Sequence, residues 1–225
     1  MNTKYRSILL LILMGCNSTP DRLPLKEEPS VQIKDSVVRI DTFYMDPDEI
    51  SSNDYREYYR CPFEEFVFDP TIPKFAKDVY LDHEWDLSND SIVLEVLDKL
   101  NTEDVRTRPF YFKVITKTKV RADGYYAEGL GGFGKEFVEN NTPEFVAYFD
   151  NQECFTANDL KTWVGIVMLE FTLEADNESE HSFVDEYILK LKSNCRNCSA
   201  AQKETLAKFT EMLHEEFTAY VKEMD

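Results

Sequence analysis

The sequence predicts a mainly α-helical protein: an antiparallel helical domain preceded by an irregular N-terminal segment that is rich in proline and aromatic residues and has little strand. Seven of the nine prolines lie at or before Pro73, and no glycine occurs between Gly15 and Gly124. From Ser88 onward, apolar residues recur at spacings of three and four, which is typical of amphipathic helices. The chain is therefore predicted to change character near residue 88.

Composition limits the classes of function. The 225 residues are 43% hydrophobic and 13% aromatic, which is too apolar for a disordered chain and enough to bury one sizeable core. The chain carries 43 acidic against 25 basic residues, for a net charge of −18. Because nucleic-acid binding needs a basic surface, we expect no nucleic-acid partner.

The first 16 residues have the pattern of an export signal. Lys4 and Arg6 precede an unbroken apolar run over residues 8–14, which Gly15 and Cys16 follow. A membrane-spanning helix needs about 20 apolar residues, whereas a signal peptide combines a positively charged start with a shorter apolar run. The pattern predicts an export signal with a cysteine at its end, and the alternatives are an ordinary secretory signal or a buried N-terminal segment.

Leu13-Met14-Gly15-Cys16 resembles the lipobox of bacterial lipoproteins. Leu13, Gly15 and Cys16 fit that motif, whereas Met14 departs from the small or β-branched residue usual there. The resemblance implies that signal peptidase II removes residues 1–15, and that Cys16 then carries diacylglycerol on its sulfur and an acyl chain such as palmitate on its amine. Asn17 is not the aspartate associated with inner-membrane retention, so we expect a soluble body anchored to the outer membrane of the cell envelope.

Two segments separate this anchor from the helical domain. Residues 16–30, which begin with the lipidated cysteine, are polar and proline-rich and are predicted to form a flexible tether. Residues 31–87 show a strand pattern at 31–40 and then a proline-punctuated stretch without helical periodicity. We expect residues 31–87 to be irregular and to wrap around the next part of the chain.

Helix-start signals recur over residues 88–225, the predicted helical domain. Ser88 or Asn89 is placed to cap a helix at 92–100, and Thr142-Pro143 to start one at 144–149. Capping boxes precede two longer apolar stripes, one beginning at Leu160 and one at Leu206; they are formed by Thr156 with Asp159 and by Ser199 with Gln202. A further stripe extends from Val184 to Leu191.

Residues 110–121, FYFKVITKTKVR, are ambiguous. Their aromatic and β-branched side chains alternate in part, as in a strand. A lone strand would have no partner nearby, so a helix is favoured.

Residues 129–134, GLGGFG, match the G-x-G-x-x-G pattern of dinucleotide-binding loops. That loop must follow a buried strand, and the preceding RADGYYAE is polar. We therefore expect no nucleotide, and interpret the glycines as positions where a helix or turn closely approaches its neighbour.

Four cysteines remain if Cys16 is lipidated: Cys61, Cys154, Cys195 and Cys198. An even number in an exported chain favours structural disulfides, and three pairings are open. Cys195 and Cys198 form a C-x-x-C just before a predicted helix, which leaves a thiol-redox role as an alternative. No second C-x-x-C or histidine pair completes a zinc site, so no metal or other cofactor is expected.

A basic island interrupts the acidic chain over residues 106–121, where six Lys or Arg residues occur without an acid. On a helix, Lys113, Lys117 and Arg121 would stack on one face. They are candidates for a site that docks an anionic partner, and the alternative is pairing with the protein's own carboxylates.

No catalytic pattern stands out, because the histidines lack metal-site spacing and no nucleophile motif occurs. The sequence favours a lipid-anchored envelope protein that acts as a binding or interaction module, for which a protein partner is expected. The alternative is an envelope enzyme with a thiol-redox role on Cys195 and Cys198.

Overall fold

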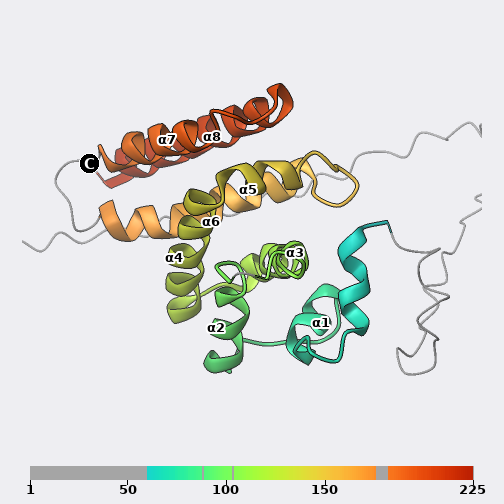
Figure 1. Cartoon of the computed structure of the whole chain (residues 1–225). Helices are drawn as coiled ribbons and strands as arrows, with labels where there is room; N and C mark the ends of the chain where they lie inside the picture. The colour runs from blue at the N-terminus through green and yellow to red at the C-terminus, as the bar shows by residue number, and fades with distance from the viewer. Residues whose placement is uncertain (1–59, 88, 103, 176–181, 225) are drawn as a thin grey trace, which may run out of the picture. The chain divides into compact units, whose positions relative to one another are not determined.

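The computed structural model describes residues 60–87, 89–102, 104–175 and 182–224, all of which belong to one compact unit of the chain. The predicted signal peptide, Cys16, the tether and the strand at 31–40 lie outside the described residues. Within those ranges every regular element is a helix, which confirms the mainly α fold (Figure 1).

The first two elements fall where the sequence predicts irregular chain. They are a 3-10 helix, η3 (Pro62–Phe68), and an α-helix, α1 (Lys74–Tyr80). Both are only seven residues long, so neither contains enough turns to produce a clear helical period. Both pack against α3 (Arg108–Thr118), and their buried apolar side chains belong to the same core as the rest of the chain.

Helix α2 (Asp90–Asp98) begins after Asn89, whose side chain accepts a hydrogen bond from the backbone N–H of Ile92. That contact confirms the predicted cap. Helix α3 continues as a short 3-10 turn, η4 (Lys119–Arg121), so residues 110–121 are helical. Because α3 packs against α1, α2, α6 and η3, it is apolar on most sides, and this is why its sequence lacks a clean amphipathic period.

Helices α4 (Gly124–Asn140) and α5 (Thr142–Tyr148) meet at a single-residue joint. The predicted cap at Thr142 is wrong, since Asn141 occupies the N-cap position of α5. The Thr142 hydroxyl instead donates to the carbonyl oxygen of Val138 at 2.7 Å, at the end of α4. The threonine hydroxyl thus satisfies a carbonyl near the end of α4 and does not cap the start of α5.

Helix α6 (Ala157–Ala175) crosses α4 at the glycine-rich stretch. A Cβ atom built on Gly131 would lie 2.8 Å from the backbone nitrogen of Glu170, and one on Gly134 would lie 2.4 Å from Cγ2 of Ile166. Real Cβ atoms essentially never come so close to such neighbours. The prediction that glycines in this stretch permit close approach is confirmed for Gly131 and Gly134, whereas a Cβ on Gly132 would make only an ordinary contact at 3.5 Å.

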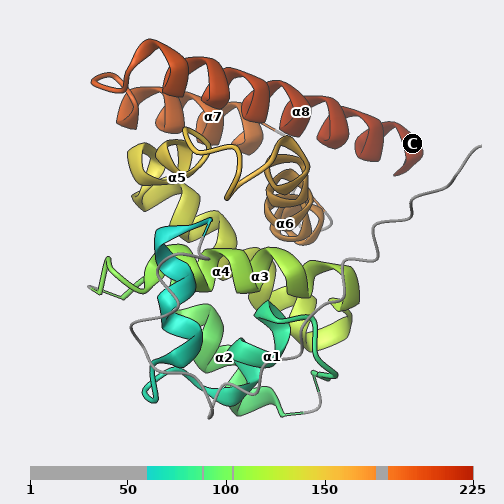
Figure 2. The ribbon, with the colours of Figure 1, turned by 90° about the vertical axis from the view of Figure 1, so that its right-hand side faces the viewer.

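Helices α7 (Phe183–Asn194) and α8 (Ala200–Met224) lie side by side and are joined by a short turn (Figures 1 and 2). This pair covers α5 and α6, while α3 and α4 lie beneath them and α1 and α2 lie at the opposite side (Figure 2). Both predicted capping boxes form. Thr156 and Asp159 exchange bonds at 2.7 and 3.2 Å, and Ser199 and Gln202 at 3.1 and 3.2 Å.

Aromatic rings from distant segments make up the centre of the core. Trp163 of α6 is fully buried and stacks on Phe112 of α3 with ring centroids 4.2 Å apart. Its indole N–H donates to the hydroxyl of Thr116 at 2.8 Å. From α8, Leu206, Phe209, Leu213 and Phe217 are buried as their stripe predicts, whereas Met224 at the end of that stripe is exposed.

Candidate functional site

The three basic residues predicted to face an anionic partner do lie along one side of α3 and η4, but each has partners within the protein. Lys113 donates to Asp159 at 2.8 Å and to the carbonyl of Cys154 at 3.1 Å. Lys117 donates to Asp82 at 2.8 Å and to a backbone carbonyl. The structure therefore supports internal pairing over docking for these side chains.

Arg121 follows the same pattern. Its guanidinium donates to the backbone carbonyl of Trp85 and lies over the indole ring, 4.2 Å from its centroid. Cation–π contacts of this kind add to the ordinary hydrogen bond. Together with Lys113 and Lys117, it attaches the α1 segment and the loop before α6 to one face of α3.

The four cysteines form two disulfides. Cys61 bonds to Cys154 across 93 residues, and Cys195 bonds to Cys198 across three. The first bond joins the start of η3 to the loop between α5 and α6, and the second closes the turn between α7 and α8. Of the three pairings that the sequence leaves open, this is the one in the structure.

The C-x-x-C pair differs from a redox motif in its surroundings. Cys195 is 1% exposed and ends α7, while Cys198 is only partly exposed and precedes the N-cap of α8. A reactive cysteine needs an accessible sulfur that is easily ionised. The pair is thus better placed to hold the α7–α8 turn than to exchange disulfides with a substrate.

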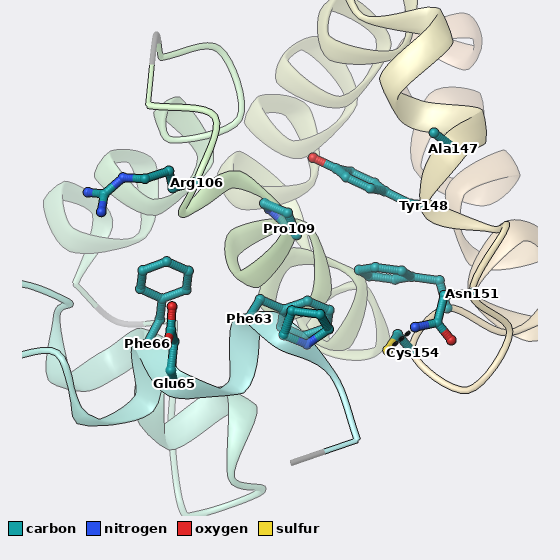
Figure 3. Close-up of a pocket in the computed structure, with 11 residues that line it drawn as sticks. Phe63, Glu65, Phe66, Arg106, Pro109, Ala147, Tyr148, Asn151 and Cys154 are labelled. Carbon is teal, nitrogen blue, oxygen red and sulfur yellow. Dashed lines mark hydrogen bonds between the residues drawn. The ribbon is translucent and has the colours of Figure 1, made fainter. Parts of the chain in front are cut away.

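The structure contains a pocket of about 390 Å³, whose lining side chains are drawn in Figure 3. Its apolar lining comes from three separate segments: η3, the start of α3, and the end of α5 with the loop that follows. We call it the aromatic pocket; it is lined by Pro62, Phe63, Glu65, Phe66, Arg106, Pro109, Ala147, Tyr148, Asn151, Cys154 and Phe155. Its volume lies within the range of small-ligand pockets, roughly 300–1,000 Å³.

Ring contacts hold the floor of the aromatic pocket in place. The Phe155 ring lies 5.2 Å from that of Phe63 and 5.2 Å from that of Tyr148, measured between centroids. Phe66 packs edge-on against Phe110 beneath it. Phe63, Phe66 and Phe155 are buried, and their mutual packing forms the floor of the pocket.

A polar group behind the pocket orients Tyr148. Its hydroxyl donates to Glu144, which also accepts from the buried guanidinium of Arg108. Burial raises the pKa of Tyr148 well above its ordinary value, and its hydrogen bond with Glu144 and the negative charge of that residue raise it further. The phenol therefore stays protonated, and this wall of the pocket is uncharged.

The disulfide and two charges define the edges of the pocket. Cys154 closes one end, where its sulfur accepts a hydrogen bond from the Asn151 amide at 3.0 Å. Glu65 and Arg106 lie near Phe66 at the other end (Figure 3). Arg106 pairs with Asp104 at 3.6 Å, whereas Glu65 is exposed and has no ion pair within the described part of the chain.

Sequence reasoning did not identify this pocket, because its walls come from segments that lie far apart in the chain. The signal in the sequence is the density of proline and phenylalanine over residues 62–75, which is equally compatible with a segment that wraps around the helical domain. Within the described ranges, no group of three His, Cys, Asp or Glu side chains is placed to hold a metal ion.

In comparisons with known proteins, no family model, curated protein or solved structure matches this chain. Across the described residues, no helix is both long and apolar enough to cross a membrane.

Proposed function

We propose that the protein is a lipid-anchored binding module of the bacterial cell envelope, and that its aromatic pocket receives an aromatic side chain of a partner polypeptide. The observation that carries the proposal is the pocket itself, with four aromatic rings and two prolines in its lining. Aromatic side chains in well-packed pockets supply much of the binding energy of protein interfaces.

The charge at the rim favours a basic residue beside that aromatic side chain. Arg106 is balanced by Asp104, which leaves the exposed carboxylate of Glu65 as the uncompensated charge at the pocket edge. The chain as a whole carries a net charge of −18, so its field attracts cationic segments. The partner chemistry that fits best is therefore a segment with adjacent aromatic and basic side chains.

The test uses short peptide probes on the full chain, followed by NMR shifts of its amide groups. N-acetyl-Phe-Arg-amide is expected to shift signals of Phe66, Tyr148 and Phe155. N-acetyl-Ala-Arg-amide and N-acetyl-Phe-Glu-amide should bind more weakly, because the first lacks the ring and the second places a carboxylate near Glu65. Equal shifts from all three probes would contradict the proposal.

Filling the pocket provides the matched variant. Ala147 lines the pocket and is half-buried, so Ala147→Phe should occupy the space meant for the ligand and abolish the shifts. Ala219 is exposed on α8 and lines none of the pockets described, so Ala219→Phe serves as the control for an added ring. If Ala147→Phe binds the Phe-Arg probe like the wild type, the pocket is not the site.

The anchor is tested separately. Cys16→Ala should prevent acylation and leave an uncleaved precursor, because the lipobox family is cleaved only after its cysteine is modified. Asn17→Ala, one residue further on, should leave acylation intact. Incorporation of labelled palmitate by the Cys16→Ala chain would contradict the lipoprotein assignment. It would leave the proposal for the aromatic pocket unchanged.

A further inference from the structure

A second cavity, of about 580 Å³, lies between α3 with η4 on one side and α6 on the other, with Glu216 of α8 at its edge. We call it the lysine groove, after Lys117, Lys119 and Lys161 in its lining. It is distinct from the aromatic pocket, with which it shares no lining residue.

Two of these lysines differ from the basic residues already described. Within the described part of the chain, neither Lys119 nor Lys161 makes a side-chain hydrogen bond or an ion pair. Lys117, by contrast, forms an ion pair with Asp82. The acidic lining residue Asp159 forms an ion pair with Lys113 and accepts a hydrogen bond from the backbone N–H of Thr156. Among the described residues, the groove therefore holds two cations without an ion-pair partner, in a strongly acidic protein.

The two side chains reach the same groove from opposite walls. Lys119 extends from η4 across α6, so that its Cε lies 3.7 Å from where a Cβ on Gly165 would stand. Lys161 precedes Gly165 by one helical turn and so lies on the same face of α6. Lys119 therefore passes over α6 at Gly165 within ordinary van der Waals distance of that position.

Glu216 adds a charge of the opposite sign. It is half-buried in the groove wall and, among the described residues, forms no ion pair with Lys119, Lys161 or any other cation. Lys161 is exposed and Lys119 and Glu216 are partly buried, so water solvates these charges when no ligand is bound and a charged ligand can replace that water. A ligand with one anionic and one cationic group would complement all three side chains.

We propose that the lysine groove binds a phosphoethanolamine group, with its phosphate between Lys119 and Lys161 and its ammonium on Glu216. Phosphate is favoured over a carboxylate because two ammonium groups match an anion with several acceptor oxygens. Val120, which is 84% exposed at the groove, offers an apolar contact to carbon atoms that continue from the phosphate.

Binding is measured by isothermal titration of the full chain with O-phosphoethanolamine, inorganic phosphate and ethanolamine. We expect O-phosphoethanolamine to bind most tightly, phosphate more weakly and ethanolamine least. Affinity should fall as salt is raised, since the contacts are between partly exposed charges. No binding of O-phosphoethanolamine at millimolar concentration would overturn the proposal.

Variants separate the three contacts. Lys119→Gln and Lys161→Gln should each weaken O-phosphoethanolamine by about tenfold or more, as expected for the loss of one charge-assisted hydrogen bond. Glu216→Gln should weaken O-phosphoethanolamine but strengthen inorganic phosphate, because it removes a repelling carboxylate. Lys203→Gln is the control, since Lys203 is exposed on α8 outside the groove.

Thermal melting gives an independent readout. Because Lys119, Lys161 and Glu216 have no ion-pair partner in the described ranges, their substitution should leave the melting temperature unchanged. Equal losses with Lys203→Gln, or a melting temperature that falls with the groove variants, would show that the groove is no specific site.

An experiment with vesicles distinguishes a lipid headgroup from a soluble ligand as the source of the phosphoethanolamine group. Vesicles of phosphatidylcholine with or without phosphatidylethanolamine are compared for sedimentation of a chain that begins at Asn17, which lacks both the lipidated cysteine and the apolar run of the signal peptide. Binding that needs phosphatidylethanolamine and is lost in Lys119→Gln assigns a lipid headgroup, whereas binding of free O-phosphoethanolamine alone assigns a soluble ligand. Failure of both arms overturns the inference and leaves the aromatic pocket untouched.

Discussion

The charged side chains of α3 illustrate how much a single residue depends on what packs beside it. Lys113 and Asp159 are both largely buried, with 20% and 11% of their side chains exposed. Lys117 pairs with an Asp82 that is 81% exposed, and Lys119, two residues further on, has no ion pair within the described part of the chain. Neighbouring lysines in one basic island thus have different roles, because helical turns direct them to different surroundings.

The combined variant Lys113→Ser, Lys117→Ser, Arg121→Ser should melt several degrees below the wild type. Loss of the buried Lys113 contact is expected to cost about 1.5–3 kcal/mol, and each of the more exposed contacts about 0–1 kcal/mol. Thermal melting checks this, with Lys203→Gln as the surface control. An unchanged melting temperature would instead favour the interpretation that these three residues dock an anionic partner.

Glu170 gives a prediction about pH. Burial raises the pKa of its carboxyl above the ordinary 4.5; Lys135 opposes the shift and Glu174 adds to it. The folded chain then holds this proton more tightly than the unfolded chain, so this group's contribution to stability falls as pH rises from about 4.5 through its folded pKa. Glu170→Gln should therefore be more stable than the wild type at pH 7, and the advantage should vanish below pH 4.5.

Glu204 provides the control of opposite sign. Its hydrogen bond and ion pair with Lys208 lower the pKa of its carboxyl, so its contribution is present above the ordinary value and is lost as pH falls. Glu204→Gln should be slightly less stable than the wild type at pH 7. The melting temperatures of both variants are measured from pH 4 to 7. If both variants melt above the wild type at pH 7, or both melt below it, this account is contradicted.

At the scale of elements, the crossing of α4 and α6 depends on glycines that fall on one side of α4. Gly131 and Gly134 face the backbone and side chains of α6 at distances that no Cβ tolerates. Gly132 lies beside them, yet a Cβ there would meet only a carboxylate oxygen of Glu170 at 3.5 Å, an ordinary contact. The glycines in this stretch therefore are not equivalent.

Alanine substitutions at Gly131 and Gly132 should change the free energy of unfolding in opposite directions. Gly131→Ala forces α4 away from the α6 backbone and is expected to lower the free energy of unfolding by about 1–3 kcal/mol. Gly132→Ala removes a flexible residue from a helix without a clash and should raise it by about 0.5–1 kcal/mol. Chemical denaturation of both variants measures the difference, and effects of the same sign would contradict the close helix approach.

For the molecule as a whole, the Cys61–Cys154 disulfide joins the first described helix to the loop before α6, and it also forms one edge of the aromatic pocket. The basic side chains of α3 attach the same N-terminal part by non-covalent contacts. Two kinds of attachment therefore hold η3 and α1 on the helical body, and with them the η3 wall of the pocket.

The two disulfides should differ in how much they stabilise the chain. A bond that closes a loop of 93 residues lowers the entropy of the unfolded chain and is expected to raise the free energy of unfolding by about 4–5 kcal/mol. A bond that closes three residues is expected to raise it by only about 2 kcal/mol. The pair Cys61→Ser with Cys154→Ser should thus lower the melting temperature more than the pair Cys195→Ser with Cys198→Ser. A larger loss from the second pair, or easy reduction of Cys195–Cys198 in the native protein, would favour the thiol-redox alternative.

The sequence by itself determined the helical class, a helix cap at Ser88 or Asn89, both capping boxes and the buried stripe of α8, and the structure then assigned that cap to Asn89. These features depend on groups within one or two helical turns of each other, so their pattern is readable along the chain. The same locality explains the errors. Short helices such as η3 and α1 carry too few turns to show a period, and Thr142 had two helix ends within reach of its hydroxyl.

Only the tertiary structure decided the disulfide pairing, the partners of the basic island, the aromatic pocket and the lysine groove. Each joins residues separated by tens of positions, and their distance in space is set by how the helices pack. Two lysines as close in sequence as Lys117 and Lys119 show the consequence: one faces Asp82 of an earlier segment, and the other crosses α6 at Gly165. A helix directs side chains two residues apart to different faces, and the chain that covers each face determines what the charge meets.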